Sequence, residues 1–384
     1  MRYRVTCLTP LLVGDGRRLS PIDYMVWKDQ INVLDQPRIV RLLSKGPRLD
    51  GYLAQIKKAE KLDFASWGGF AQNFAGRRIQ FEHPSSTPCW ERAHGEVLFI
   101  PTFSAGPSGP FLPASALKGA LRTGIVAARI SPGALREVAA KLQSDRPPRR
   151  PAEALEAQTA GPPGTSRMKA VGLSDSAVVA TSSFKVFLLR SSTLVPRGNG
   201  FELGWKVSPR GSVDGRRVED STPLFAEMAA PGTVFEGRWR EDRFFARPEI
   251  LDALNWREFP GHERLLEGAN RFSAALVAVH RQYAEMAGLP ILGQSLDALA
   301  ATVAEAAQGD RACVLPLGWG GGFLTKVAST DTGGENYRLV LRQVGLYSRA
   351  IQTGLPFPKT RRIVFLEGRP ATLPGWVRLE VLGE

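Results

Sequence analysis

Strand-like runs recur along the whole chain, and stretches with helical periodicity separate them. Residues 3–13 alternate and end at the turn Gly14-Asp15-Gly16, while residues 24–27 and 31–34 resemble a short hairpin around Lys28-Asp29-Gln30. Further strands are predicted at residues 78–82, 96–100, 171–175, 183–189, 201–207, 233–240, 363–366 and 376–382. The strands beyond residue 171 predict a second sheet, and the lack of a short-period repeat in the sequence disfavours solenoids and propellers.

Helical patterns are predicted at residues 37–44, 50–62, 111–130, 263–286, 296–307 and 338–351, with another stretch that ends at Leu142. Pro113 can open the third of these, because its missing N–H would be unsatisfied there anyway. A chain of 384 residues suggests about two domains, and we divide it into residues 1–143, 144–170 and 171–384. Residues 144–164 contain five prolines and three arginines, a composition that neither helix nor sheet can use, so we interpret them as a mobile basic insertion.

Basic residues outnumber acidic ones, because 50 Lys and Arg stand against 37 Asp and Glu and give a net charge of +13. This balance favours polyanionic partners, with nucleic acid first among them. Eight basic residues lie between positions 338 and 378, where Glu367 is the only acidic residue. Arg342 and Arg349 fall opposite the apolar positions of a predicted helix, so this face is expected to meet phosphate or, alternatively, only solvent.

A glycine cluster at Gly318, Gly320, Gly321 and Gly322 surrounds Trp319. Glycines let main-chain N–H groups approach a phosphate or ribose closely, and Lys326 is near enough in sequence to add a cation. No Walker ending and no strand–GxGxxG–helix unit occurs, so no nucleotide cofactor is predicted. The structural alternative is a tight turn, in which Trp319 and Phe323 would anchor the core instead of stacking on unpaired bases.

A second anion site is predicted where a helix begins near Ala114. Its free N–H groups and positive dipole end lie close to Ser115, Lys118 and Arg122. The alternative is an ordinary amphipathic helix whose basic residues solvate one edge. We predict that this helix and the glycine cluster converge into a cationic cradle for a ribose-phosphate strand.

Residues suited to catalysis are present but scattered. The spacing of His83, Cys89 and His94 matches no familiar ligand pattern, so no metal is predicted. Asp15 and Asp23 flank the first turn and would be the candidates for work on a scissile phosphate, although turn capping explains them more simply. A nuclease role is therefore the weaker interpretation, and no histidine lies beside the glycine cluster.

Compartment signals favour a soluble, reducing environment. Cys7, Cys89 and Cys313 are odd in number and far apart, so neither a disulfide framework nor a zinc knuckle is encoded. The start MRYRVTCLTP lacks the apolar stretch of a signal peptide, and no apolar run approaches the roughly 18 residues that span a bilayer. We expect a cytoplasmic protein with no membrane partner.

Several motifs in fixed order resemble one family. They are LTPLLVGDG and LSPIDY near the start, FLPASALKGALR in the middle, then GWGGGF, FPKTRR and GWVRLE. Together they resemble the RAMP superfamily and, within it, the subunit-five family of the Csm complex, the type III-A CRISPR effector. The matches span nearly the whole chain, and SPIDY and PKTRR narrow the choice within the superfamily.

The resemblance implies an α+β fold of two ferredoxin-like, RRM-related halves with helical insertions, the glycine-rich loop belonging to the second half. It implies a subunit that binds the guide crRNA toward its 3′ end, caps the filament of backbone subunits and supports guide maturation by recruiting cellular nucleases. Its partners would be crRNA, target RNA, and the neighbouring backbone and small subunits of the complex. The alternatives are a RAMP endoribonuclease acting on precursor or target RNA, and a purely structural cap that touches RNA little.

The resemblance transfers roles to a limited set of positions. Ser115, Lys118 and Arg122 fall in the shared central motif, and Gly318, Gly320, Gly322 and Lys326 fall in or beside the glycine loop. The middle of that loop lacks the Thr or Ser that the family often has, so a backbone role is implied there instead of a side-chain role. Sequence-independent binding through phosphates and 2′-hydroxyls suits a guide whose sequence varies.

Overall fold

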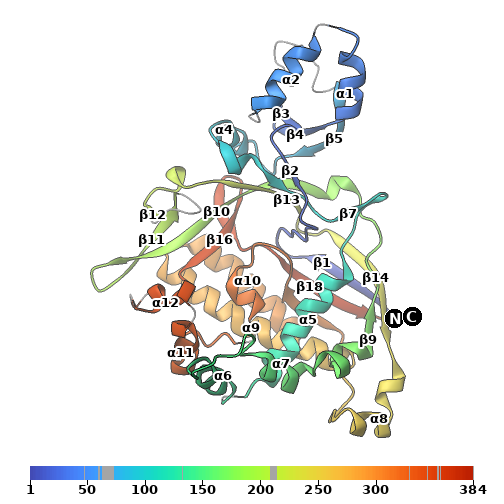
Figure 1. Cartoon of the computed structure of the whole chain (residues 1–384), viewed down its shortest axis with the longest axis vertical. Helices are drawn as coiled ribbons and strands as arrows, with labels where there is room; N and C mark the ends of the chain where they lie inside the picture. The colour runs from blue at the N-terminus through green and yellow to red at the C-terminus, as the bar shows by residue number, and fades with distance from the viewer. Residues whose placement is uncertain are drawn as a thin grey trace.

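The computed structural model describes residues 1–46, 48–58, 61–62, 73–131, 133–207, 214–327, 329–343, 345–352, 354 and 356–383, without the side chains of residues 214, 345, 346, 349 and 350. Within these ranges helices pack on antiparallel sheets, so the prediction of a mixed α+β chain is confirmed (Figure 1). The division at residues 143 and 171 and the two ferredoxin-like halves stay predictions.

The first sheet has five antiparallel strands in the order β15–β18–β1–β14–β9. Their bounds are β1 Arg2–Cys7, β9 Val171–Leu173, β14 Val234–Glu241, β15 Ala312–Pro316 and β18 Trp376–Leu382. In β1 the alternate side chains of Tyr3, Val5 and Cys7 are buried, as a strand with one face on a core requires. β1 lies between β14 and β18, so the first strand pairs with two strands from far along the chain.

The second sheet predicted from the sequence is confirmed, and its long strand β10 (Phe184–Arg197) organises it. One edge of β10 pairs with β13 (Leu224–Ala229) and then with β11 (Gly200–Lys206), while the other edge pairs with β16 (Thr360–Leu366). The outer strands are β12 (Asp214–Gly215) and β17 (Arg369–Thr372). Strands β13, β15 and β17 were not expected from the sequence.

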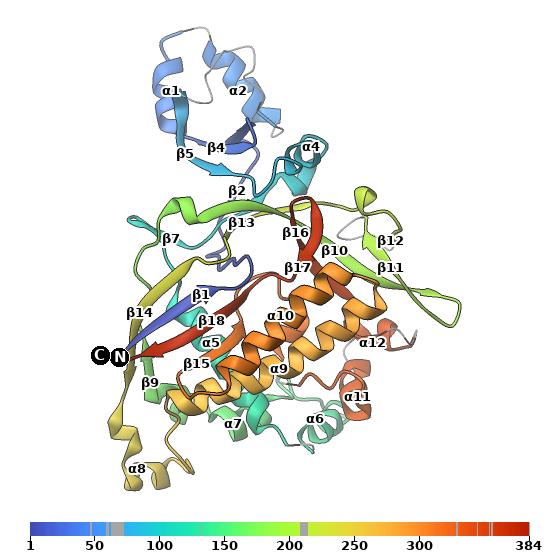
Figure 2. The same cartoon turned by 180° about the vertical axis from the view of Figure 1, so that it is seen from behind.

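Two long helices, α9 (His262–Met286) and α10 (Pro290–Ala306), lie side by side (Figure 2). Helix α5 (Ala114–Arg129) packs closely on α9, because a Cβ at Gly124 would be only 2.9 Å from Ala269 Cα. The apolar stripe predicted for α5 is confirmed, since Leu117, Leu121 and Ile125 enter the core that covers the first sheet.

The remaining elements are short. The helices are α4 (Ser86–Glu91), α6 (Ala134–Leu142), α7 (Glu153–Ala160), α8 (Pro248–Ala253), α11 (Glu335–Gln343) and α12 (Gly345–Gln352). The strands are β2 (Arg18–Leu19), β6 (Ile100–Pro101), β7 (Ala105–Gly106) and β8 (Gly109–Pro110). Turns of 3-10 helix occupy Gly95–Leu98, Pro163–Thr165, Arg167–Ala170, Thr181–Ser183, Val218–Asp220, Arg243–Ala246 and Phe323–Lys326.

A small apical unit stands at one end of the molecule in Figure 1 and has a core of its own. It comprises β3 (Tyr24–Trp27), β4 (Gln30–Leu34), β5 (Ala75–Gln80), α1 (Gln36–Leu43) and α2 (Arg48–Lys58). The predicted hairpin is confirmed, and both Lys28 and Asp29 have positive φ, as a tight two-residue turn requires. An ion pair between Arg77 of β5 and the buried Glu227 of β13 joins this unit to the second sheet.

Three expectations for secondary structure are wrong in part. The strand expected at residues 96–100 is a 3-10 turn at Gly95–Leu98, which Gly95 enters with φ of 60°, followed by the two-residue β6. Residues 144–164 do form helix in α7, because the prolines flank eight residues rich in Ala and Glu and Gly161 ends the helix at positive φ. The helix expected at residues 338–351 is two helices, α11 and α12.

Candidate nucleic-acid interface

The first turns of α5 and the glycine cluster meet at one open cavity of about 510 Å³, the α5 groove. The helix contributes Ser115, Ala116, Gly119, Ala120 and Thr123, the glycine segment contributes Pro316, Leu317, Gly318, Trp319, Thr325 and Lys326, and the first turn contributes Val13 and Gly14. The helix and the glycine cluster therefore converge as expected, but of Lys118, Arg122 and Lys326 only Lys326 lines the groove. Binding of RNA by these residues stays a prediction.

The glycine cluster is fixed on the end of the first strand. Gly318 has φ of 75°, and a Cβ there would be 2.2 Å from the carbonyl oxygen of Leu12. The Trp319 amide donates to that same oxygen at 2.7 Å. Gly320 has φ of 98° and lies against Pro374. Glycine is required at these positions by both conformation and close packing, so the tight-turn interpretation holds alongside the proposed backbone role.

Three main-chain amides of this loop have no backbone partner among the described residues. Within the ranges that the structure describes, no backbone carbonyl accepts a hydrogen bond from the amides of Gly320, Gly321 or Gly322. Buried or half-buried amides normally find a partner in the protein, in water or in a ligand. Three consecutive free amides in a glycine turn are the geometry that holds an anion by the backbone.

The three basic residues expected near α5 lie in different surroundings. Lys118 is half-buried on α5 and is not among the residues that line the groove. Burial lowers the pKa of its ammonium group. Lys326 lines the groove directly. The guanidinium of Arg122 instead pairs with Glu156 of α7 at 2.6 Å, so the insertion helix already neutralises this charge.

The two arginines expected on the C-terminal helical stretch lie elsewhere. Arg342 is exposed on α11, which packs on α6, and it lines neither the α5 groove nor the cavity behind the glycine loop. Arg349 lies in α12, and its side chain is outside the described residues. Of the apolar positions expected on this helix, Ile351 is buried and Val340 and Tyr347 are half-buried, while Val344 lies outside the described residues. Tyr337 and Leu341, which were not among those positions, are also buried.

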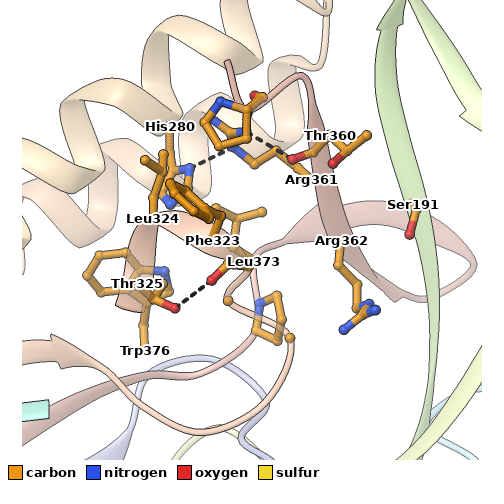
Figure 3. Close-up of a pocket in the computed structure, with 15 residues that line it drawn as sticks. Ser191, His280, Phe323, Leu324, Thr325, Thr360, Arg361, Arg362, Leu373 and Trp376 are labelled. Carbon is orange, nitrogen blue, oxygen red and sulfur yellow. Dashed lines mark hydrogen bonds between the residues drawn. The ribbon is translucent and has the colours of Figure 1, made fainter. Parts of the chain in front are cut away.

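A second cavity, of about 160 Å³, lies on the other side of the glycine loop (Figure 3). Residues Gly320, Gly321 and Gly322 form one wall, and Ser191, Thr360 and Arg362 stand opposite. The Arg362 guanidinium stacks 4.1 Å from the centre of the Trp319 ring, and its Nε is buried without a hydrogen-bond partner. Burial also lowers the pKa of Arg362. A half-buried cation thus lies beside main-chain amides in this cavity, which we call the arginine pocket.

Arg361 and Arg362 point to opposite sides, as neighbours on a strand must. Figure 3 shows Arg361 directed toward His280 and Arg362 away from it. The Arg361 Nε donates to His280 Nδ1 at 2.9 Å, and its guanidinium lies 4.4 Å from the centre of the Tyr283 ring. Burial lowers the pKa of Arg361 to about 10. Burial and the Arg361 charge together hold the pKa of His280 well below 6.5, so this imidazole is neutral.

The buried His280 predicts acid sensitivity of the fold. The unfolded chain takes up a proton near the ordinary histidine pKa of 6.5, whereas the folded chain cannot. The contribution to stability is thus complete above that pH and falls as the pH drops below it, by up to about 1.4 kcal/mol per pH unit. Urea unfolding between neutral pH and pH near 5 measures the slope. In His280→Gln, which keeps an acceptor for Arg361, we expect a shallower slope, and equal slopes in the two proteins would contradict this account.

The aromatic residues of the loop have separate roles. Phe323 packs against Tyr347 and Phe357 at centroid distances of 5.2 Å each, so it is a core anchor. Trp319 is half-buried and presents one face to Arg362 while it lines the α5 groove. Of the two, Trp319 is the one placed to meet a base or ribose.

The residues considered for catalysis have local partners. Asp15 accepts a hydrogen bond from the Arg17 amide at 3.0 Å, and Asp23 accepts from the Ser20 amide at 2.7 Å, as turn-capping residues do. Among the described residues, no group of three or more His, Cys, Asp or Glu side chains is placed to hold a metal ion. In the same ranges, no helix is long and apolar enough to cross a bilayer.

The sequence reasoning missed Arg362, Ser191 and Thr360. The motif FPKTRR drew attention to the segment, and the excess of basic residues there was a usable signal. The pattern alone does not tell which of the two arginines enters the core. That assignment depends on the register of β16 against β10, which places Arg362 opposite Ser191.

Comparison with known proteins points to the family that the sequence motifs resemble. The model of the RAMP superfamily matches residues 4–274. A chain in the cryo-EM structure of a Csm-crRNA-target RNA ternary complex of a type III-A CRISPR-Cas system is 23% identical, with 99% of this chain and 100% of that chain covered and a TM-score of 0.66. Csm5 of T. onnurineus is 19% identical, with coverages of 97% and 99% and a TM-score of 0.58. These two likenesses are of fold, and no curated protein matches the sequence significantly.

Proposed function

Because this chain belongs to the RAMP superfamily, we propose that it is a subunit of a type III-A CRISPR effector of the Csm kind and binds the 3′ region of the guide crRNA. The fold likeness over the full length of both structural neighbours supports this assignment. Its place would be at the end of the backbone filament, in contact with backbone and small subunits and near target RNA. Capping of the filament and help with crRNA maturation in the cytoplasm, through recruited nucleases, complete the proposed role.

The observation that carries the proposal is the meeting of α5 and the glycine loop at one groove. Ser115 of α5 and Lys326 of the glycine segment both line it, and Trp319 offers a ring face. All of these groups recognise parts that every nucleotide has, namely phosphate, ribose and the face of a base. A guide whose sequence differs from one spacer to the next requires contacts of this kind.

The arginine pocket extends the groove across the loop. Its free amides and Arg362 would take a phosphate of the same strand, so we place Arg362 among the RNA-binding residues and Arg122 among the structural ones. Arg342 and Arg349 stay as predictions for the flanking surface. We also propose that the fold consists of two ferredoxin-like halves with helical insertions.

Single replacements Lys326→Ala and Arg362→Ala are expected to weaken binding of single-stranded RNA roughly fivefold each near 0.1 M salt and to lower the salt slope by about 0.7. The physical reason is that each variant releases one fewer counterion per strand bound. Filter binding or fluorescence anisotropy across salt concentrations, with RNAs of unrelated sequence, measures both quantities.

The matched control for these variants is Arg240→Ala, an exposed arginine on β14 away from both cavities. It should change neither affinity nor slope. If Lys326→Ala and Arg362→Ala bind RNA as the control does, the groove is not the RNA site. A purely structural cap would then be the better description.

A further inference from the structure

A separate pocket of about 280 Å³ lies between the C-terminal end of α5 and the first turns of α9. Five arginines line it, and we call it the five-arginine pocket: Arg129, Arg167, Arg257, Arg264 and Arg271. Only two carboxylates, Glu258 and Glu267, share the lining. The cavity therefore holds three more positive than negative charges.

Both carboxylates are already shared between arginines. Glu258 pairs with Arg129 at 3.0 Å and with Arg264 at 2.9 Å. Glu267 pairs with Arg264 at 2.9 Å and with Arg271 at 3.4 Å. In the described parts of the chain, no carboxylate lies within ion-pair distance of Arg167 or Arg257. The excess charge is thus not compensated by the protein.

Arg167 forms the buried part of the pocket. Its residue is only 7% exposed, and one terminal nitrogen donates to the Thr159 carbonyl at 3.0 Å. Its Nε is buried and has no hydrogen-bond partner. Burial, and then the nearby Arg129 charge, lower the pKa of this guanidinium. An unpartnered buried donor on an arginine is costly unless something else accepts from it.

The framework of the pocket is rigid. Gly124 of α5 and Gly268 of α9 bring the two helices into backbone contact, since a Cβ at Gly268 would be 3.1 Å from the Gly124 carbonyl oxygen. Trp256 packs beneath Arg167 with its ring centre 6.0 Å from the guanidinium. Arg129, Arg264 and Arg271 are therefore presented by packed helices and Arg167 by a 3-10 turn, whereas Arg257 lies in the loop between α8 and α9.

We infer that the five-arginine pocket binds a phosphate monoester or diphosphate group. Arginine forks match phosphate oxygens in geometry, and a phosphate monoester or diphosphate brings two or more negative charges to a site with an excess of three. A phosphodiester linkage or a carboxylate side chain brings one charge each and leaves most of the excess. The site is distinct from the α5 groove, because Ser115 and Arg129 are roughly 20 Å apart along the helix at 1.5 Å per residue.

Two sources supply this chemistry, a free diphosphate or the terminal phosphate of a nucleic acid. Isothermal titration of the full chain with inorganic pyrophosphate, at constant ionic strength, tests the site directly. We expect saturable one-site binding that Arg257→Gln and Arg271→Gln each weaken about tenfold, since each removes a charge-assisted contact. The exposed control Arg240→Gln should bind as the unaltered protein does.

Arg167→Met should abolish binding, and thermal melting shows whether this variant still folds. If Arg167→Met does not fold, the affinities of the Arg257→Gln and Arg271→Gln variants for pyrophosphate decide whether the pocket binds it. Absence of saturable heat at millimolar pyrophosphate, or equal affinity in all variants, would overturn the inference.

A competition arm identifies the source. The competitors are a short RNA with a 3′-terminal phosphate and the same RNA with a 3′-hydroxyl. If only the RNA with the terminal phosphate displaces pyrophosphate, the pocket binds a strand end. If neither RNA displaces pyrophosphate, the pocket binds a free diphosphate. Lys326→Ala should leave the affinity for pyrophosphate unchanged. If this variant also lost pyrophosphate binding, the pocket would be part of the RNA groove, and the inference of a separate site would be wrong. The proposed RNA function is tested by the salt titration of RNA binding, whereas the pocket is tested by pyrophosphate binding. Failure of one proposal is therefore distinguishable from failure of the other.

Discussion

Gly318→Ala is expected to lower the free energy of unfolding by about 3 kcal/mol or more and to abolish RNA binding in the α5 groove. A Cβ in the left-handed region costs about 1–2 kcal/mol by itself. At this position it would also be 2.2 Å from the Leu12 carbonyl oxygen, so the loop must move away from the strand. That movement breaks the hydrogen bond from the Trp319 amide and takes Trp319 out of the groove. Urea unfolding and RNA titration of the same preparation measure the two losses.

Gly322→Ala is the matched control, because Gly322 also has positive φ, at 80°, but a Cβ there meets nothing within 4 Å. We expect this variant to show only the conformational cost of about 1–2 kcal/mol and to keep the groove intact. Equal destabilisation by the two variants would mean that conformation alone fixes glycine in the loop and that contact with Leu12 does not matter.

Arg77→Leu is expected to destabilise the protein by about 3–5 kcal/mol, because it leaves the carboxylate of Glu227 buried without its partner. Glu227 is 1% exposed in β13, and Arg77 reaches it from the apical unit. Burial also lowers the pKa of Arg77. The double variant Arg77→Leu/Glu227→Leu should recover most of the loss, since no charge then remains buried.

The surface pair Arg4–Glu236 provides the comparison, with the same residue types at 2.9 Å and both side chains more than 40% exposed. Arg4→Leu should cost less than about 1 kcal/mol. Urea unfolding of the three variants and the unaltered protein completes the test. A single Arg77→Leu variant as stable as Arg4→Leu would show that the Glu227 carboxylate is not isolated from water.

Much of the site follows from local sequence, and the rest depends on pairing between distant segments. The periodicity of Leu117, Leu121 and Ile125 predicts helix α5 and the face that it buries, and the glycine cluster predicts a loop with accessible amides. Neither pattern explains why residue 318 must be glycine. The reason is its close approach to the Leu12 carbonyl group, which lies more than 300 residues earlier in the chain. Composition over a window of 21 residues likewise hid α7, since the prolines cluster at both ends of the segment.

The placement of the arginines was the least predictable feature. The sequence predicts that Arg122 faces RNA because it does not reveal the ion pair with Glu156. Glu156 belongs to a segment for which the sequence predicts no helix. Arg362 was overlooked because its direction is set by the register of β16 on β10. The five-arginine pocket gathers residues from four separate segments, so no sequence window contains it.

The position of β1 has a consequence for synthesis. This strand is made before both of its partners, since β14 follows it by about 230 residues and β18 by about 370. At translation rates of about 5–20 residues per second, the edge that pairs with β14 waits roughly 10 to 50 s and the edge that pairs with β18 roughly 20 to 70 s. During that interval Tyr3, Val5 and Cys7 have no sheet to cover them, so co-translational folding of this chain should depend on chaperones that shield its beginning.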